Sequence, residues 1–340
     1  MKSMEQEEQA KALEAAKGGN EHAFAQLIDP HRRELLVHCY RILGSFEDAE
    51  DMLQETLVRV WKHLDAFEER SSLRAWLYKI ATNASLDALD SRRVRGLPKE
   101  LYARGDPTQP LPPPLQTASW VEPFPDEWID DQPEMYPEAR YEVRESITLA
   151  FIAALQKLPG RQRAVLLLCD VMGWSSSEAA DILDMTTAAV NSALQRARES
   201  LKQTERKSTP TRLNEQLSSL LQRYIAAWEN ADSAALIAVL REDVALTMPP
   251  LPVWFGGHAD VKTFLDGFLF RGIDPFKVKL ESVRANGSPA FATYQMDQDR
   301  VYRAAAIHIL TIEDGLISEI NDFLTFDGQL FNKFGLPLMV

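Results

Sequence analysis

One stretch, residues 173–201 (GWSSSEAADILDMTTAAVNSALQRARESL), constrains the fold more than any other part of the chain. Ser175 and Glu178 have the spacing of a capping box, in which a hydroxyl accepts from an unpaired helix N–H and the glutamate reaches back. Asp184 lies at the expected turn, and Thr186 is a favourable N-cap for a second helix. The pattern predicts two short helices joined by a tight turn.

The second helix of this pair has two different faces. Its apolar residues recur at helical spacing and are expected to be buried: Val190, Leu194, Ala197 and Leu201. The opposite face carries short polar groups first and arginines later: Thr186, Thr187, Ala188, Asn191, Gln195, Arg196 and Arg198. Such a helix fits the DNA major groove, with its first residues near base edges and its arginines near phosphates. An amphipathic helical pair inside a bundle is the alternative, which the tight turn and small exposed residues disfavour.

Length and composition describe a multidomain globular protein. The 340 residues suffice for two or three domains, and 45% hydrophobic with 26% charged residues is typical of soluble proteins. Without an N-terminal apolar segment or a long uncharged apolar run, we expect a cytoplasmic protein with no membrane contact. Cys39 and Cys169 lie far apart in apolar helical patterns, which predicts reduced core thiols. We expect no metal and no cofactor.

The net charge of −13 limits how this chain can meet DNA. A DNA-binding chain this acidic must concentrate its cations locally or be brought to DNA by a larger partner.

The first predicted domain, residues 21–97, is helical. We expect its first helix, residues 22–43, to be interrupted around Pro30. Residues 46–67 follow with a regular apolar face. A second stripe mixes acid, amide and aromatic groups: Asp51, Gln54, Glu55, Val58, Trp61 and Lys62. That composition suits a protein partner, but an ordinary solvated face with Trp61 half buried explains it as well.

A third helix is predicted to begin at Ser71 and Ser72, after the loop AFEERSS. Its outer face and the segment after it are cationic: Arg74, Lys79, Arg92, Arg93 and Arg95, together with Asn83. Such a face can bind phosphates, or it can serve solubility alone.

The order of these segments resembles the sigma-70 family, in its small extracytoplasmic-function (ECF) group of RNA polymerase sigma factors. The resemblance rests on SFEDAEDMLQETLVRVW, then SSLRAWLYKIATNASLDALDSRRVR, then LPGRQRAVLLLCDVMG with the helical pair above. It covers roughly residues 21–97 and 145–202. It implies sigma region 2 over residues 21–97, a proline-rich linker over 98–143 and a region 4 helix-turn-helix over 144–207.

The resemblance also implies roles for residues of the first domain. The residues that would dock on the polymerase β′ clamp helices are Asp51, Gln54, Glu55 and Trp61. Those that would hold a base flipped from the minus-ten element are Phe67, Glu68, Glu69, Arg70 and Ser71. Asn83 would lie near the upstream edge of that element, and Lys79, Arg92 and Arg93 would contact backbone. Unstacking the base costs a few kcal/mol, which a binding pocket offsets.

Region 4 would read the minus-thirty-five element in the major groove and touch the β flap. Many relatives carry Lys or Arg where Asn191 and Ala193 stand here, so no base preference follows from the resemblance.

The linker is rich in proline and lacks helical periodicity, which predicts an extended chain. It also contains aromatic residues that a plain spacer does not need: Trp120, Phe124, Trp128 and Tyr136. These residues could dock on a neighbouring domain or run through the polymerase, and a spacer without further role remains an alternative.

The third predicted domain, residues 211–334, has a different pattern. A helix with Leu213, Leu217, Leu220, Tyr224 and Trp228 on one face precedes several alternating strand-type runs. Asn286–Gly287 and Asp314–Gly315 between such runs are strong hairpin signals. The expected fold is an α+β cone, so the whole chain combines two all-α domains with one α+β domain.

The segment MPPLPVWFGG with the following helix resembles the SnoaL-like branch of the NTF2/ketosteroid-isomerase superfold. A subgroup of these sigma factors, the mycobacterial sigma G type, carries such an extension, and the linker LPPP…WVEPFPDEW resembles it too. Residues expected to line a conical pocket are Trp254, His258, Tyr294, His308 and Asp322. Some relatives use a His/Asp pair for acid–base chemistry. Because a fold does not carry a function, we favour satisfied core polar groups, with no catalytic residue.

The leading hypothesis is therefore a sigma factor that binds core RNA polymerase and promoter DNA. Its C-terminal domain would regulate it, replacing or supplementing an anti-sigma factor, with an unidentified small ligand as a possible effector. Two alternatives are a SnoaL-type cyclase or isomerase fused to DNA-binding helices, and a helix-turn-helix regulator that binds duplex DNA alone. The latter needs neither the acidic face nor the AFEERSS loop.

Overall fold

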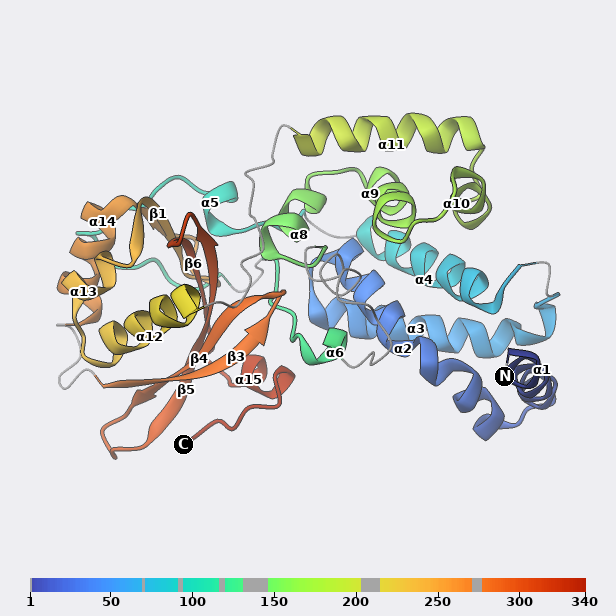
Figure 1. The fold of residues 1–340 in the computed structure, drawn as a ribbon, viewed down its shortest axis with the longest axis horizontal. Helices are drawn as coiled ribbons and strands as arrows, with labels where there is room; N and C mark the ends of the chain where they lie inside the picture. The colour runs from blue at the N-terminus through green and yellow to red at the C-terminus, as the bar shows by residue number, and fades with distance from the viewer. Residues whose placement is uncertain are drawn as a thin grey trace. The chain divides into compact units, whose positions relative to one another are not determined.

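The computed structural model describes residues 2–68, 71–90, 94–115, 120–130, 146–202, 215–270 and 277–340 (Figure 1). The chain divides into two compact units. The first combines residues 1–94, 128–146 and 151–205, and the second combines 95–127, 147–150 and 206–340. The linker segment 95–127 thus belongs to the same compact unit as the C-terminal sheet.

The first unit begins with helices. Their bounds are α1 (Lys2–Lys17), α2 (Glu21–Leu43), α3 (Phe46–His63), the 3₁₀ turn η1 (Leu64–Ala66) and α4 (Leu73–Asp90). Asn20 and Ser45 cap α2 and α3 by accepting from the N–H groups of Ala23 and Asp48. Gly44 ends α2 with φ of 69°, a left-handed conformation that suits glycine.

The expected interruption at Pro30 is wrong, because α2 continues through it. Pro30 removes one backbone hydrogen bond, but Leu27 and Ile28 before it and Leu35 and Leu36 after it are all buried. Burial on both sides of the proline stabilises one continuous helix more than the missing bond destabilises it.

The helix-turn-helix is confirmed. The helices of this part are α8 (Leu149–Gln156), α9 (Gly160–Leu166), the π-helical turn η2 (Leu167–Val171), α10 (Ser176–Leu183) and α11 (Thr187–Lys202). Ser175 and Glu178 form the capping box of α10, and Asp184 turns the chain with φ of 50°. The hydroxyl of Thr186 accepts from Ala189 N–H at the start of α11.

The second unit contains one six-stranded sheet in the order β2-β1-β6-β5-β4-β3. The strands are β1 (Leu240–Thr247), β2 (Trp254–Gly256), β3 (Val278–Ala285), β4 (Ser288–Met296), β5 (Tyr302–Glu313) and β6 (Leu316–Leu324). Neighbouring strands are antiparallel except for β1 and β6, which are parallel. Both predicted hairpin turns are present: Asn286 and Asp314 have φ of 52° and 53°, and a glycine with positive φ follows each.

Helices cover both faces of this sheet (Figure 1). They are α12 (Glu215–Glu229), α13 (Ser233–Ile237), α14 (Gly257–Phe264) with the π-helical η3 (Leu265–Leu269), and α15 (Gln329–Lys333). The helices α12 to α14 enclose one hydrophobic core with the sheet. On the other face, Phe331 of α15 packs edge-on against Tyr294 of β4. The expected α+β fold is confirmed.

The linker contacts both edge strands of the sheet. It contains the short helix α5 (Pro98–Leu101) and reaches α6 (Glu127–Asp130). Gly105 N–H donates to Trp254 O of β2 over 2.9 Å, and Asp126 N–H donates to Arg284 O of β3 over 3.2 Å. Edge strands leave backbone groups unpaired, and the linker satisfies several of them here. Of its aromatic residues, Trp120 and Phe124 are buried, whereas Tyr136 lies outside the described residues.

Candidate partner- and DNA-binding surfaces

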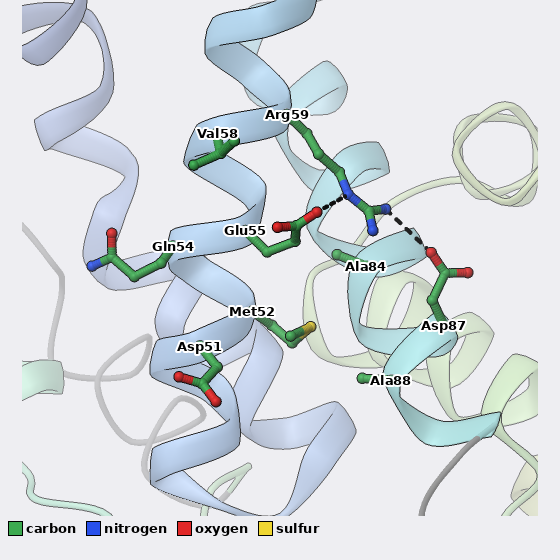
Figure 2. Close-up of a pocket in the computed structure, with 9 residues that line it drawn as sticks. All are labelled: Asp51, Met52, Gln54, Glu55, Val58, Arg59, Ala84, Asp87 and Ala88. Atoms are coloured by element: carbon green, nitrogen blue, oxygen red, sulfur yellow. Dashed lines mark hydrogen bonds and ion pairs between the residues drawn. The ribbon is translucent and has the colours of Figure 1, made fainter.

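A shallow groove lies between α3 and α4 (Figure 2). Its lining residues are Asp51, Met52, Gln54, Glu55, Val58, Arg59, Ala84, Asp87 and Ala88. Asp51, Gln54 and Val58 project from one side of α3, whereas Glu55 turns toward α4 (Figure 2). Val58 is 45% exposed, which is high for an apolar side chain. The groove thus combines carboxylates, an amide and an open apolar surface.

An ion-pair network joins the two helices of this groove. Arg59 Nε donates to Glu55 Oε1 over 2.8 Å, and its Nη1 donates to Asp87 Oδ2 over 3.2 Å. Hydrogen bonding to Glu55 raises the pKa of Arg59. Sequence reasoning did not single out Arg59 or Asp87. The i,i+4 spacing of Glu55 and Arg59 could have indicated the first pair, but the second joins residues of different helices.

Three of the four predicted polymerase-binding residues, Asp51, Gln54 and Glu55, line the groove. The fourth, Trp61, is not among its lining residues. The indole of Trp61 packs edge-on against Phe24 with ring centroids 4.9 Å apart, and it remains 38% exposed. One part of the indole is therefore fixed by Phe24, and the rest is accessible to a partner.

The residues predicted for the minus-ten element differ in their surroundings. Phe67 is buried, with its ring 5.0 Å from that of Trp76, so this side chain does not offer an open face. Glu68 and Ser71 are exposed, and Asn83 is partly exposed on α4. The remaining predicted residues, Glu69, Arg70, Arg92 and Arg93, lie outside the described residues.

Lys79, the other minus-ten candidate, contacts the turn of the helix-turn-helix. Its Nζ donates to Asp184 Oδ1 over 2.5 Å and to Asp181 O over 3.1 Å. Beside this pair, Tyr78 packs edge-on against Trp174 with centroids 5.2 Å apart. A cation predicted to bind DNA backbone is therefore bound to a carboxylate in this arrangement.

The outer face of α11 is as predicted: Thr186, Thr187, Ala188, Asn191, Gln195, Arg196 and Arg198 are all exposed. Several of these side chains have defined partners. The hydroxyl of Ser176 donates to Asn191 Oδ1 over 2.6 Å, and Gln195 Nε2 donates to Glu199 Oε1 over 3.0 Å. Two nitrogens of Arg198 donate to the carboxylate of Asp170 over 2.9 and 2.6 Å.

In the C-terminal domain, His308 and Asp322 form a buried pair. They are opposite each other on β5 and β6, with Nε2 and Oδ1 3.3 Å apart. The hydroxyl of Tyr224 lies 2.8 Å from His308 Nδ1. Burial lowers the pKa of His308 to about 3 and raises the pKa of Asp322 to about 7. Because burial penalises both charged forms, a neutral imidazole beside a protonated carboxyl is favoured below neutral pH.

The other three residues expected in this pocket lie elsewhere, so the expectation of one five-residue lining is corrected. Trp254 Nε1 donates to Tyr102 O of the linker, and His258 Nε2 lies 3.1 Å from Leu240 O. Side chains alternate along a strand, so Tyr294 lies on the face of β4 opposite to Phe291 and packs on α15. Among the described residues, no group of histidine, cysteine and acidic side chains could hold a metal ion.

Comparison with known proteins identifies the chain. Residues 27–95 match sigma-70 region 2, residues 148–201 match sigma-70 region 4, and residues 221–320 match the SnoaL-like domain. The chain is 44% identical over 319 residues to the ECF RNA polymerase sigma factor SigG of Mycobacterium tuberculosis, covering 92% of this chain and 84% of SigG. It belongs to the ECF RNA polymerase sigma factors.

Further relatives match either about half or nearly all of this sigma factor. The RNA polymerase sigma factor CnrH of Cupriavidus metallidurans is 34% identical over 188 residues, which cover 55% of this chain and 88% of CnrH. The crystal structure of the M. tuberculosis ECF sigma factor SigJ has a TM-score of 0.56 at 21% identity, covering 90% of this chain and 97% of SigJ. That likeness shows the same fold.

These findings confirm the predicted family, fold class and function: the chain is a sigma factor with a C-terminal SnoaL-like domain. Its family is one of transcription initiation factors. No helix in the described part of the chain is both long and apolar enough to cross a membrane.

Proposed function

We propose that the α3–α4 groove docks this sigma factor on the β′ clamp helices of core RNA polymerase. The observation that carries the proposal is the lining of the groove. It offers Asp51 and Gln54 beside the exposed Val58, while Arg59 orients Glu55. A charged rim around an apolar contact is typical of a protein interface.

Promoter DNA is proposed to bind to two surfaces of the first unit. The outer face of α11 would enter the major groove at the minus-thirty-five element, because all its predicted contact residues are exposed. The loop before α4 and the face with Lys79 and Asn83 would bind the minus-ten element. Lys79 would then exchange the carboxylate of Asp184 for a DNA phosphate.

The C-terminal domain is proposed to regulate initiation by holding the linker, and so to replace or supplement an anti-sigma factor. Asn286 supports this proposal, because it bonds to Phe124 of the linker and to Ile147, just before α8. A catalytic role receives no comparable support. His308 and Asp322 are buried, and the ring of Trp228 lies 4.7 Å from that of His308.

The docking proposal is tested by charge reversal in the full chain. Asp51→Lys with Glu55→Lys is expected to weaken binding to core polymerase at least about tenfold, because two carboxylates of one surface change sign. Asp65→Lys is the control, since Asp65 is exposed but not among the groove residues. Binding is measured by fluorescence anisotropy, and initiation by transcription in vitro. Unchanged affinity for core polymerase in the double variant would exclude this groove as the docking surface.

A further inference from the structure

Two amide side chains on the exposed face of α11 bind neighbouring side chains through opposite ends. Asn191 is bound through its oxygen and Gln195 through its nitrogen. A side-chain amide has a carbonyl oxygen that accepts and an NH₂ group that donates. Free in solvent, it can present either end to DNA. A partner that binds one end leaves the other end to face a ligand.

Asn191 is held by its oxygen. The hydroxyl of Ser176, the first residue of α10, donates to Asn191 Oδ1 over 2.6 Å. Within the described residues the NH₂ group of Asn191 has no protein partner, and the side chain is exposed. Asn191 therefore presents hydrogen-bond donors.

Gln195, one helical turn later, is held by its nitrogen. Its Nε2 donates to Glu199 Oε1 over 3.0 Å. An ionised carboxylate can only accept hydrogen bonds, so this contact fixes which end of the amide faces Glu199. The Oε1 atom of Gln195 then remains as the end that DNA can meet. Asn191, Gln195 and Glu199 line one shallow groove along α11.

We propose that α11 carries a preset base-reading code, in which Asn191 donates to one base pair and Gln195 accepts from another. This inference rests on the proposed entry of α11 into the minus-thirty-five major groove. It assigns Ser176 and Glu199 as positioning residues, although neither is itself required to touch a base.

The code follows from the groups that bases expose in the major groove. Guanine offers two acceptors there, thymine offers O4, and cytosine offers only a donor, its N4 amino group. Asn191 can therefore donate to guanine, to thymine or to N7 of adenine, and is expected to reject cytosine at its position. Gln195 is expected to favour the amino groups of cytosine or adenine and to reject guanine. A free amide can bind adenine with two hydrogen bonds, one donated to N7 and one accepted from N6. This bidentate contact is disfavoured at the Asn191 position and at the Gln195 position, because one end of each amide is already bound.

The spacing of the two residues also limits where these preferences fall. Two residues four positions apart rise about 6 Å along a helix, and base pairs are stacked about 3.4 Å apart. The donor-reading and acceptor-reading positions are therefore expected one or two base pairs apart.

The test is a base-preference profile of initiation by full-length protein with core polymerase, on promoters randomised across the minus-thirty-five element. Asn191→Ala and Gln195→Ala first locate the two positions. Ser176→Ala is then expected to reduce discrimination against cytosine at the Asn191 position by about tenfold, while the Gln195 position keeps its preference. Ser175, not Ser176, caps α10, so the helix retains its cap. Ser177→Ala, at the exposed neighbouring serine, is the matched control.

The complementary pair of variants is at Glu199. Glu199→Ala is expected to reduce discrimination against guanine only at the Gln195 position. Glu199→Gln is expected to reduce the same discrimination, because an amide at position 199 can also donate to Gln195 Oε1 and no longer fixes which end of Gln195 faces DNA. Removing a negative charge near DNA raises affinity for all sequences alike, so the profile separates positioning from charge.

The outcomes separate the base-reading code from the proposed function of α11. If initiation by the unmodified protein does not depend on the minus-thirty-five sequence, the proposed function of α11 fails. If it does depend on that sequence but Ser176→Ala and Glu199→Ala both leave the base profile unchanged, the code is overturned while the function of α11 stands.

Discussion

Replacing Asn286 by glycine is the sharpest test of how the C-terminal domain holds the linker. Asn286 is fully buried in the turn between β3 and β4. Its backbone N–H donates to Phe124 O over 2.9 Å, its Oδ1 accepts from Phe124 N–H over 2.8 Å, and its Nδ2 donates to Ile147 O over 2.7 Å. Glycine keeps the left-handed turn, because it adopts positive φ without strain. The substitution therefore removes the two side-chain bonds and spares the hairpin.

The magnitude follows from the groups left behind. Phe124 N–H and Ile147 C=O would lose their partners in a buried site, and each unpaired buried group costs about 1–3 kcal/mol. A combined loss of about 3 kcal/mol corresponds to roughly a hundredfold more frequent opening of the linker. Hydrogen–deuterium exchange of the full chain measures this directly, as faster exchange of the amides of residues 120–127.

The second hairpin supplies a matched control. Asp314 has φ of 53°, precedes Gly315 and is exposed, so Asp314→Gly makes the same kind of change without touching the linker. If Asn286→Gly accelerates exchange at Phe124 no more than Asp314→Gly does, the two side-chain bonds do not hold the linker. The reasoning would then be refuted.

Two further predictions concern charge. The Lys79–Asp184 pair is partly exposed, with side chains 36% and 70% accessible, and is therefore worth about 0.5–1 kcal/mol. Asp184→Asn keeps a residue that tolerates the left-handed turn and should loosen the α4–α10 contact, measured by energy transfer between labels on the two helices. It should loosen the contact less when Lys79 is already replaced by methionine; equal effects in both backgrounds would contradict an ion pair. Asp322→Asn should change the pH dependence of stability. Burial raises the pKa of Asp322 to about 7, so its stabilising contribution is complete below about pH 4 and is lost as the pH rises through 7. His308, with its pKa lowered to about 3, acts in the opposite sense, losing stability as the pH falls below about 6.5. The test is the free energy of unfolding of both proteins, measured by denaturation at several pH values. Between pH 4 and 8 the unmodified protein should lose stability relative to Asp322→Asn. A difference in stability that does not depend on pH would contradict the raised pKa.

Much of the candidate DNA-binding site could be predicted from sequence because it is local. The 3.6-residue period places Val190 and Leu194 inside and Asn191 and Gln195 outside, and the structure agrees. The contact of Asn191 with Ser176 could not be predicted in this way. It depends on the angle between α10 and α11, which no periodicity encodes.

The predicted pocket in the C-terminal domain shows the same limit. His308 is buried, as a pocket residue would be, but its pairing with Asp322 depends on the register of β5 and β6. Tyr294 packs against α15, which covers one face of the sheet, and Trp254 donates a hydrogen bond to the linker, which lies against β2. Neither residue lines a pocket with His308. Sequence patterns give the face of a strand but not what packs against it.

The sequence by itself determined the elements of this protein: capped helices, a helix-turn-helix and hairpins at Asn286 and Asp314. Each depends on backbone preferences and bonds within a few residues. Only the tertiary structure decided that the proline-rich linker binds the sheet edges, that Lys79 pairs with Asp184, and that Asn286 serves both a turn and the linker. These contacts join residues 100 or more positions apart. Which of them form depends on which backbone groups and charges remain unpaired after the elements have packed.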